Sequence, residues 1–221
     1  MKAIITGATG MVGKGVLLEC LDHEKVTQVL VIGRNQVGIQ HPKLKELIHK
    51  DFYDFSFVKD QLKGYDACFY CMGVSSVGMS EADYSRVTYS FAMALANVLV
   101  TVNPEMTFNY VSGEGTDSTE KGRSMWARVK GKTENDIINA GFAQTFMFRP
   151  GAIIPLRGIK SRTKAYQFMY DYFMWLVKLV KLLAPNSVVT TTQVGLAMIN
   201  SVYKSYPTKI LRPKDIIKLS A

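Results

Sequence analysis

The chain has 221 residues, with 27 basic and 18 acidic side chains and a formal net charge of +9. Hydrophobic residues make up 48% and charged residues 20%, a balance that excludes an intrinsically disordered chain and is typical of a globular protein. A chain of this length buries roughly 70–75% of its unfolded surface, so we expect one substantial core.

Short β-branched runs alternate with helix-like stretches through the first 150 residues. We predict strands at 2–6, 28–32, 45–49, 67–72, 107–111 and 144–148, and helices at 12–22, 57–62, 81–102 and 126–140. This alternation predicts an α/β fold, a Rossmann-like doubly wound parallel sheet. We expect residues 1–155 to form this NAD(P)-binding domain, with 156–221 as a small C-terminal substrate lobe packed on it in one compact unit.

The chain starts with Met1 and Lys2 and enters the first predicted strand directly. This leader is too short for the apolar core of a signal peptide, and glycines follow it at once. We therefore expect a cytoplasmic location.

A glycine-rich loop joins the first strand to the first helix. Its glycines, Gly7, Gly10 and Gly13, have the spacing G-x-x-G-x-x-G. Gly7 allows a tight exit from the strand, Gly10 lets a pyrophosphate approach the backbone, and Gly13 lets the helix pack near the strand. The predicted pyrophosphate site comprises Gly7, Thr9, Gly10, Met11, Val12 and Gly13.

The end of the second strand predicts which nucleotide binds. An acidic residue about 20 positions after the last glycine would bind a ribose 2′-hydroxyl, but this position holds Gly33, followed by Arg34 and Asn35. A guanidinium binds a 2′-phosphate bidentately. The sequence therefore predicts NADP(H) in preference to NAD(H).

Three cysteines, Cys20, Cys68 and Cys71, are too few for a disulfide scaffold. Cys68 and Cys71 have a C-x-x-C spacing, but they lie in an apolar run that predicts a strand, where residues three apart face opposite ways. Since the sequence contains no second pair, we predict core cysteines in a reducing compartment and no metal site.

Together, these motifs resemble a known family. The T-G-A-T-G-x-x-G start, Gly33-Arg34-Asn35 and Asp51-Phe52 are similar to those of the atypical short-chain dehydrogenase/reductases, NAD(P)-binding proteins described as nucleoside-diphosphate-sugar epimerase-like. The resemblance extends along the chain through 110–113, 149–151 and 192–195.

The resemblance implies further cofactor contacts. By this resemblance, Asp51 and Phe52 contact adenine, and the segment Cys71, Met72 and Gly73 lines the adenosine ribose. The residues expected beside the nicotinamide are Pro150, Gly151 and Ile153.

The resemblance also implies a catalytic set. In this family a serine after the fifth strand acts with Y-x-x-x-K on the next helix, where the tyrosine exchanges a proton and the lysine holds the ribose. Ser112 and Lys130 fit two of these positions, but Trp126 stands four residues before Lys130, in the place of the tyrosine. Indole does not exchange a proton near neutral pH. Tyr84 and Tyr166 are candidates to substitute.

The positive charge is confined to the last third of the chain. Residues 1–150 carry 16 basic and 16 acidic groups, whereas 151–221 carry 11 basic and two acidic groups. The densest cluster, Arg157, Lys160, Arg162 and Lys164, is either a solvated face or attracts an anionic substrate, partner or membrane surface. Nucleic-acid motifs are absent from the sequence, so we expect no nucleic-acid partner.

The stretch 166–184 is mostly apolar and aromatic, but Asp171, Lys178 and Lys181 interrupt it. Charges at mid-span disfavour a transmembrane helix. This stretch packs on the sheet domain, mediates an oligomer contact or lies on a membrane surface. We expect a monomer or a homodimer.

Two functions fit these observations. One is an NADP(H)-dependent oxidoreductase or epimerase-like enzyme with a small, anionic or neutral carbonyl or sugar-nucleotide substrate. The other is a catalytically silent NADP(H)-sensing binding protein, which Trp126 favours.

Overall fold

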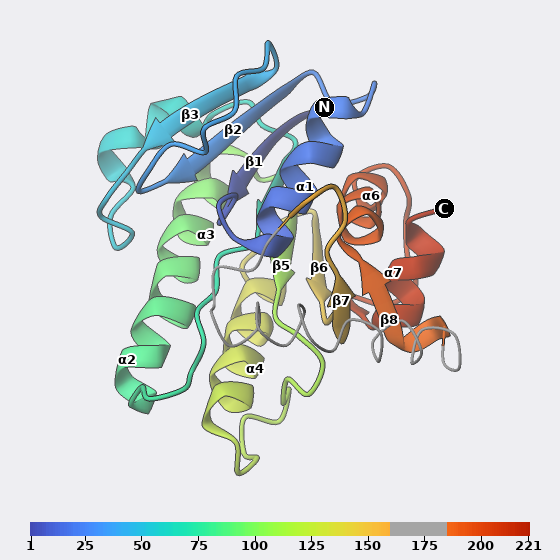
Figure 1. Cartoon of the computed structure of the whole chain (residues 1–221). Helices are drawn as coiled ribbons and strands as arrows, with labels where there is room; N and C mark the ends of the chain where they lie inside the picture. Colours follow the sequence, from blue (N-terminus) through green and yellow to red (C-terminus); the bar gives the residue numbers. More distant parts are fainter. Residues whose placement is uncertain (160–184) are drawn as a thin grey trace.

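The computed structural model describes residues 1–159 and 185–221. Within them, a seven-stranded parallel sheet has the strand order β3-β2-β1-β4-β5-β6-β9 (Figure 1). Its strands are β1 (Lys2–Thr6), β2 (Gln28–Gly33), β3 (Leu44–Ile48), β4 (Ala67–Tyr70), β5 (Thr107–Val111), β6 (Gln144–Phe148) and β9 (Ile210–Leu211). The predicted doubly wound parallel sheet is confirmed.

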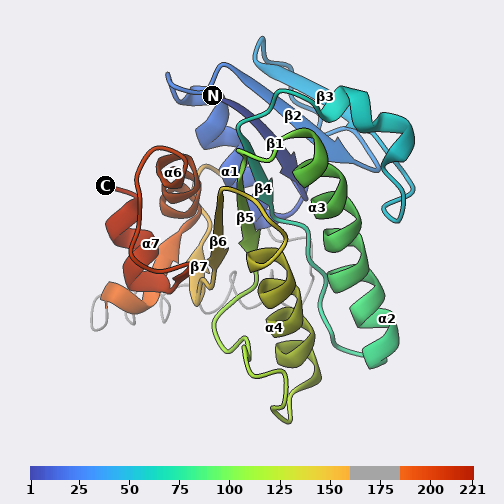
Figure 2. The same cartoon turned by 180° about the vertical axis from the view of Figure 1, so that it is seen from behind.

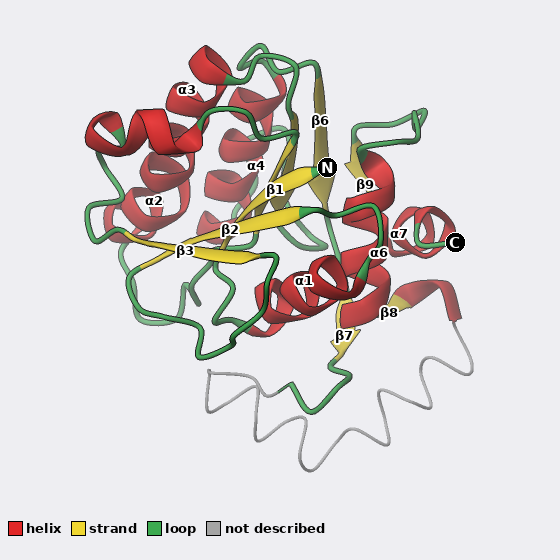
Figure 3. Ribbon diagram, turned by 90° about the horizontal axis from the view of Figure 1, so that it is seen from above, coloured by secondary structure: helices red, strands yellow, loops and turns green. Residues whose placement is uncertain are grey.

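Helices cover both faces of the sheet, as seen from above in Figure 3 and from behind in Figure 2. One face carries α1 (Met11–Asp22), α6 (Thr191–Ser201) and α7 (Pro213–Leu219). The other carries α2 (Glu81–Ser85), α3 (Phe91–Val102) and α4 (Met125–Ile138), with a π-helical turn, Arg86–Ser90, between α2 and α3. The 3₁₀ turns are Ser56–Leu62 and Pro185–Ser187.

The core is split into two clusters, one on each face of the sheet, because successive strand residues point to opposite sides. On β1, Ile5 packs in the cluster that includes α1 and α6, whereas Ile4 packs in the cluster that includes α3. Both side chains are fully buried. Each such burial stabilises the fold by about 1.5–3 kcal/mol, which explains why the strands are apolar throughout rather than alternating.

The strand order reverses direction between β1 and β4, and this topological switch point positions the site. All strands of this sheet run parallel, so their carboxyl ends meet at one edge. Ligands of open α/β sheets bind in the crevice outside that edge. The segments that leave it begin with Gly7, Arg34, Cys71, Ser112 and Arg149.

The C-terminal residues complete the same unit. β9 pairs with β6, and α6 packs against α1 so closely that a Cβ on Gly195 would lie 2.7 Å from Glu19 Cγ. A separate two-stranded sheet pairs β7 (Ala152–Ile154) with β8 (Val188–Thr190). The described part of 156–221 therefore shares its core with the seven-stranded sheet, and the boundary at residue 155 stays a prediction.

The strands and helices predicted for the first 150 residues are all observed, with ends that differ by at most two residues. The sequence analysis did not predict β7, β8, β9, α6 or α7. The stretch 166–184 and the cluster residues Lys160, Arg162 and Lys164 lie outside the described residues. Arg157 is described, and its guanidinium pairs with Asp22 at 2.8 Å, so its charge is partly offset.

One described helical run, Glu81–Val102, has the length and composition of a membrane span, with a mean hydropathy of 1.2. This is weak evidence, because the core helix of a globular protein meets the same criteria. Here Ala92, Leu95 and Leu99 are fully buried against the sheet. These residues account for one face of α3, while 28% of the most apolar window of Glu81–Val102 is buried.

Candidate functional site

The loop between β1 and α1 forms a cradle that only glycine can build. Gly7 has φ +70°, and a Cβ there would lie 2.6 Å from the carbonyl oxygen of Cys71 on β4. A Cβ on Gly13 would lie 2.3 Å from the carbonyl oxygen of Gly7. The Gly10 amide donates to that same Gly7 oxygen at 2.8 Å, which closes the turn. Backbone thus occupies the space that side chains would need.

The amino terminus of α1 presents backbone amides to this cradle. Its N-cap is Gly10, which supplies no side-chain acceptor, and the first turn, all within the described part, carries no acidic residue. The first amides of a helix have no partner inside the helix and carry a partial positive charge. They fit an anion, and the cradle fits the pyrophosphate of a dinucleotide.

The end of β2 offers a free cation. Arg34 and Asn35 are exposed, and Arg34 forms no hydrogen bond or ion pair with any residue in 1–159 or 185–221. The turn after them is held by Glu46 on β3, which accepts from the Val37 amide at 2.8 Å. The Glu46 carboxylate is therefore engaged with the backbone of this turn. The guanidinium of Arg34 is available for a ligand.

The residues expected at the adenosine have different degrees of exposure. Asp51 is exposed and accepts from the Tyr53 amide at 2.9 Å. The ring of Phe52 is buried and packs edge-on against Phe55, with ring centroids 5.6 Å apart. Phe52 therefore has only its backbone left for adenine.

The segment after β4 lies beside the glycine cradle. Cys71 and Met72 are half-buried, while Gly73 is exposed with open space around its Cβ position. The amide of Cys71 donates to the Thr6 carbonyl at 3.3 Å, which ties the ends of β4 and β1 together. The contacts of this segment with the ribose stay predictions.

The segment after β6 passes the end of β5. Pro150 is buried, and its carbonyl accepts from the Glu114 amide at 3.0 Å. A Cβ on Gly151 would lie 3.1 Å from the Ser187 carbonyl oxygen, so this position is tightly packed. Ile153 is buried in the core cluster with α1. The placement of these residues beside a nicotinamide stays a prediction.

The hydroxyl of Ser112 points into the protein. Ser112 is buried, and its Oγ donates to Glu134 Oε1 at 2.5 Å and lies 3.2 Å from the Phe148 carbonyl oxygen. A hydroxyl has only one proton to donate. In Ser112 that proton is directed at acceptors inside the protein, so it is not available to a ligand.

The side chain of Lys130, on α4, is directed toward the backbone of Ser112. Its Nζ donates to the backbone carbonyl of Ser112, and its side chain is half-buried. Burial lowers the pKa of the Lys130 ammonium to about 8, although the nearby Glu134 carboxylate opposes this shift. The structure thus brings the predicted residues Ser112 and Lys130 together.

Trp126 lies one turn before Lys130 and covers the loop that leaves β5. A Cβ on Gly115 would lie 3.2 Å from the Trp126 Cη2 atom. The same loop is fixed to α4 farther on, since a Cβ on Gly131 would lie 1.8 Å from the Asp117 carbonyl oxygen and the Asp117 amide donates to Ala127. The indole is thus a fixed surface of the loop after β5.

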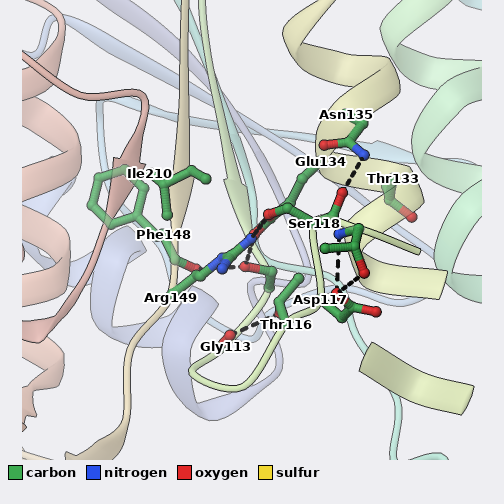
Figure 4. Close-up of polar contacts among 12 residues, drawn as sticks. Gly113, Thr116, Asp117, Ser118, Thr133, Glu134, Asn135, Phe148, Arg149 and Ile210 are labelled. Atoms are coloured by element: carbon green, nitrogen blue, oxygen red, sulfur yellow. Dashed lines mark hydrogen bonds and ion pairs between the residues drawn. The ribbon is translucent and has the colours of Figure 1, made fainter. Parts of the chain in front are cut away.

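Sequence reasoning missed a buried ion pair beneath this site. Glu134 is fully buried, and Arg149 reaches it from the end of β6 (Figure 4). Arg149 Nε donates to Glu134 Oε1 at 3.0 Å, and Arg149 Nη2 donates to Glu134 Oε2 and, at 2.5 Å, to Ser118 Oγ. Glu134 follows Lys130 by four residues on the same helical face, a spacing that could have indicated it.

The substitute tyrosines do not supply an evident acid. Tyr84 is only 2% exposed and belongs to the buried interior near Tyr110. Tyr166 lies outside the described residues. The cysteines Cys20, Cys68 and Cys71 are free thiols, and burial raises the pKa of each.

A family model described as the NAD dependent epimerase/dehydratase family matches residues 3–118. Among curated proteins, Protein FMP52-1, mitochondrial, of Scheffersomyces stipitis is 25% identical over 156 residues, 70% of this chain and 68% of that protein. Protein HTATIP2 of Rattus norvegicus is 25% identical over 69% of this chain and 63% of its own length. The chain thus spans about two thirds of these relatives.

Solved structures share the fold at low identity. The Bordetella bronchiseptica enzyme WbmF in complex with NAD+ and UDP has a TM-score of 0.71 at 13% identity, over 96% of this chain and 71% of that one. A UDP-glucose 4-epimerase has a TM-score of 0.68 at 16% identity, over 99% and 80%. The resemblance inferred from the sequence motifs is confirmed.

The expected cytoplasmic location is wrong in the light of these relatives. Three proteins of the FMP52 type, from Scheffersomyces stipitis, Meyerozyma guilliermondii and Debaryomyces hansenii, are named mitochondrial, at 25–27% identity. The expectation rested on the short leader before the first predicted strand, and the names of these relatives contradict it.

Proposed function

Because the chain belongs to the NAD dependent epimerase/dehydratase family, we propose that it is an NADP(H)-binding oxidoreductase or epimerase-like enzyme with a small carbonyl or sugar-nucleotide substrate. The observation that carries this proposal is the backbone cradle of Gly7 and Gly13 at the uncapped start of α1. Its position at the switch point of the sheet is where such ligands bind.

The proposed roles combine the geometry of the site with the family resemblance. The α1 amides hold the pyrophosphate, Arg34 holds the 2′-phosphate, and Lys130 holds the nicotinamide ribose. When bound, the nicotinamide supplies or accepts a hydride. The chain must then orient the substrate and exchange a proton with its oxygen.

Replacing Arg34 with alanine should weaken NADPH binding by roughly 10- to 100-fold, as expected for the loss of a charge-assisted hydrogen bond to phosphate. NADH affinity should change little, since NADH lacks the phosphate. Parallel fluorescence titrations with NADPH and NADH measure both dissociation constants. Lys45→Ala, which removes an exposed cation on β3, is the matched control and should leave the ratio unchanged. An unchanged ratio in Arg34→Ala would exclude this role.

A second candidate function is supported by Trp126. An indole N–H donates a hydrogen bond but does not exchange a proton near neutral pH, and the Ser112 hydroxyl is engaged with Glu134. A protein that binds NADP(H) without turnover, and reports its level to a partner, would tolerate both features.

Replacing Trp126 with tyrosine tests the catalytic position that the family resemblance implies. For an enzyme, the phenol should raise NADPH oxidation over a panel of carbonyl compounds by roughly tenfold or more, since a positioned acid is worth about 10²–10⁴-fold. Trp126→Phe provides the aromatic control without a hydroxyl. If NADPH still binds and Trp126→Tyr oxidises it no faster than Trp126→Phe, the catalytic role assigned to this position is wrong.

A further inference from the structure

We propose that Lys130 is the proton-exchanging group of this site, and that Glu134 and Arg149 are its positioning residues. This inference rests on the oxidoreductase function proposed above. It is carried by the hydrogen-bonded chain that runs from Arg149 through Glu134 and Ser112 to Lys130.

Among residues 1–159 and 185–221, the other groups considered at the carboxyl edge of β5 are engaged or chemically unsuited. The indole of Trp126 does not ionise near neutral pH. The Ser112 hydroxyl is directed at Glu134. Glu114 is exposed and paired with Arg212 at 2.5 Å, and Tyr84 is buried.

Lys130 retains free donors. An ammonium has three N–H groups, and the one contact that the described residues provide is the Ser112 carbonyl. That carbonyl fixes the direction of the side chain. The remaining N–H groups are available to a ribose hydroxyl and to a substrate oxygen on the same side of the loop.

Glu134 and Arg149 act on Lys130 in two ways. The carboxylate holds Ser112 by its hydroxyl, and Ser112 in turn holds Lys130 by its carbonyl. The negative charge of Glu134 also lies one helical turn from the ammonium and favours its protonated form. Arg149 fixes the carboxylate through two hydrogen bonds, so that the acceptor for Ser112 cannot turn away.

Four elements packed around Lys130 and Glu134 contribute charged or titratable groups. α4 contributes Glu134, the end of β6 contributes Arg149, β5 contributes Tyr110 and α2 contributes Tyr84. Burial raises the pKa of the Tyr110 phenol, which leaves it neutral. Burial lowers the pKa of Lys130 to about 8, so both protonation states are accessible under working conditions, as general acid–base catalysis requires.

The proton balance of the step is simple. Lys130 Nζ gives a proton to a carbonyl oxygen as that oxygen becomes a hydroxyl, and the resulting amine takes a proton from water. The hydride that reduces the carbonyl carbon comes from a reduced nicotinamide. In the oxidative direction the neutral amine accepts the hydroxyl proton instead.

The test measures the pKa of the Lys130 amine in the protein alone, so it needs no substrate. Trace acetylation with acetic anhydride from about pH 6 to about pH 11, read by peptide mass spectrometry, gives a midpoint for each lysine. We expect about 8 for Lys130 and about 10.4 for exposed lysines. Glu134→Gln should lower the Lys130 midpoint, because it removes the opposing carboxylate. Ser118→Ala is the matched control: it removes a hydroxyl contact of Arg149 that is not part of the contacts leading to Lys130, and it should leave the midpoint unchanged.

A second variant covers the case in which Glu134→Gln does not fold. Replacing both charges, Glu134→Met with Arg149→Met, leaves no unpaired charge and should also lower the midpoint. An ordinary midpoint for Lys130 in the wild type overturns the proposal. So does an unchanged midpoint in the folded variant.

NADPH titration of the same samples separates this inference from the function on which it rests. Affinity should weaken as the pH rises through about 8 in the wild type, but not in Lys130→Arg, because arginine keeps its charge. A wild type that binds NADPH with no such weakening overturns the role of Lys130 alone. A wild type that binds no NADPH at any pH overturns the proposed function, whatever the labelling midpoint.

Discussion

Replacing Gly13 with alanine is expected to abolish nucleotide binding. The new methyl group would lie 2.3 Å from the carbonyl oxygen of Gly7 and 2.6 Å from its carbonyl carbon, so the cradle itself must move. We expect NADPH affinity to fall at least about 100-fold, or about 2.7 kcal/mol. Stability should fall by about 1–3 kcal/mol, as for other overpacked sites. Isothermal titration calorimetry with NADPH and urea denaturation measure the two effects.

Gly73→Ala is the steric control for this substitution. Gly73 is also predicted to line the nucleotide site, but its Cβ position has open space, so the free energy of unfolding should stay near that of the wild type. Equal stability of Gly13→Ala and Gly73→Ala would show that the loop adapts at no cost. Undiminished NADPH binding in Gly13→Ala would contradict the cradle as the pyrophosphate site.

Replacing Arg149 with methionine is expected to destabilise the protein by about 3–5 kcal/mol. Among the described residues, the substitution leaves the fully buried Glu134 carboxylate with one neutral hydroxyl, that of Ser112, as its hydrogen-bond partner. The cost arises mainly from this unpaired charge, because methionine fills much of the volume of the lost side chain. Urea denaturation monitored by circular dichroism gives the free energy of unfolding.

The double variant Glu134→Gln with Arg149→Met tests that cause. It removes both charges, so it should be clearly more stable than Arg149→Met alone. Ser118→Ala removes only one hydroxyl contact of Arg149 and should cost about 1 kcal/mol. If Arg149→Met unfolds as readily as Ser118→Ala, the buried pair contributes little, and its role in fixing Ser112 is in doubt.

The glycine cradle could be predicted because its causes are local. Gly7, Gly10 and Gly13 lie within seven residues between a strand and a helix, and the steric demand of that turn is expressed in residue type. Arg34 could be predicted for a similar reason, because it directly follows β2. The strands themselves were predictable from their apolar runs, since strands covered on both faces show little alternation.

The pairing of Glu134 with Arg149 could not be predicted in the same way. In the sequence, Arg149 belongs to a motif of the resembled family, whereas Glu134 has no feature that separates it from other polar residues of its helix. Their contact depends on β6 lying beside β5 and on α4 crossing both, which brings together residues that are 15 positions apart. The inward direction of the Ser112 hydroxyl follows from that pair, so it too was hidden from the sequence.

The short strand β9 is a second feature that the sequence did not predict. Two residues, Ile210 and Leu211, carry too little pattern to predict a strand, yet they extend the sheet beside Met147 and Phe148. Their conformation is decided by the unpaired edge of β6, which offers backbone partners. The same edge brings the C-terminal helices α6 and α7 onto the face that α1 covers.

The sequence by itself determined the parallel sheet, the glycine-rich loop after β1, the missing acidic residue after β2 and the presence of Trp126 where a tyrosine was expected. These features are encoded in short segments, where steric limits and hydrophobic periodicity act on neighbouring residues. Only the tertiary structure decided which side chain each polar group faces. That choice depends on low-dielectric contacts between distant segments, which make a buried carboxylate stable only beside its guanidinium and turn Ser112 inward.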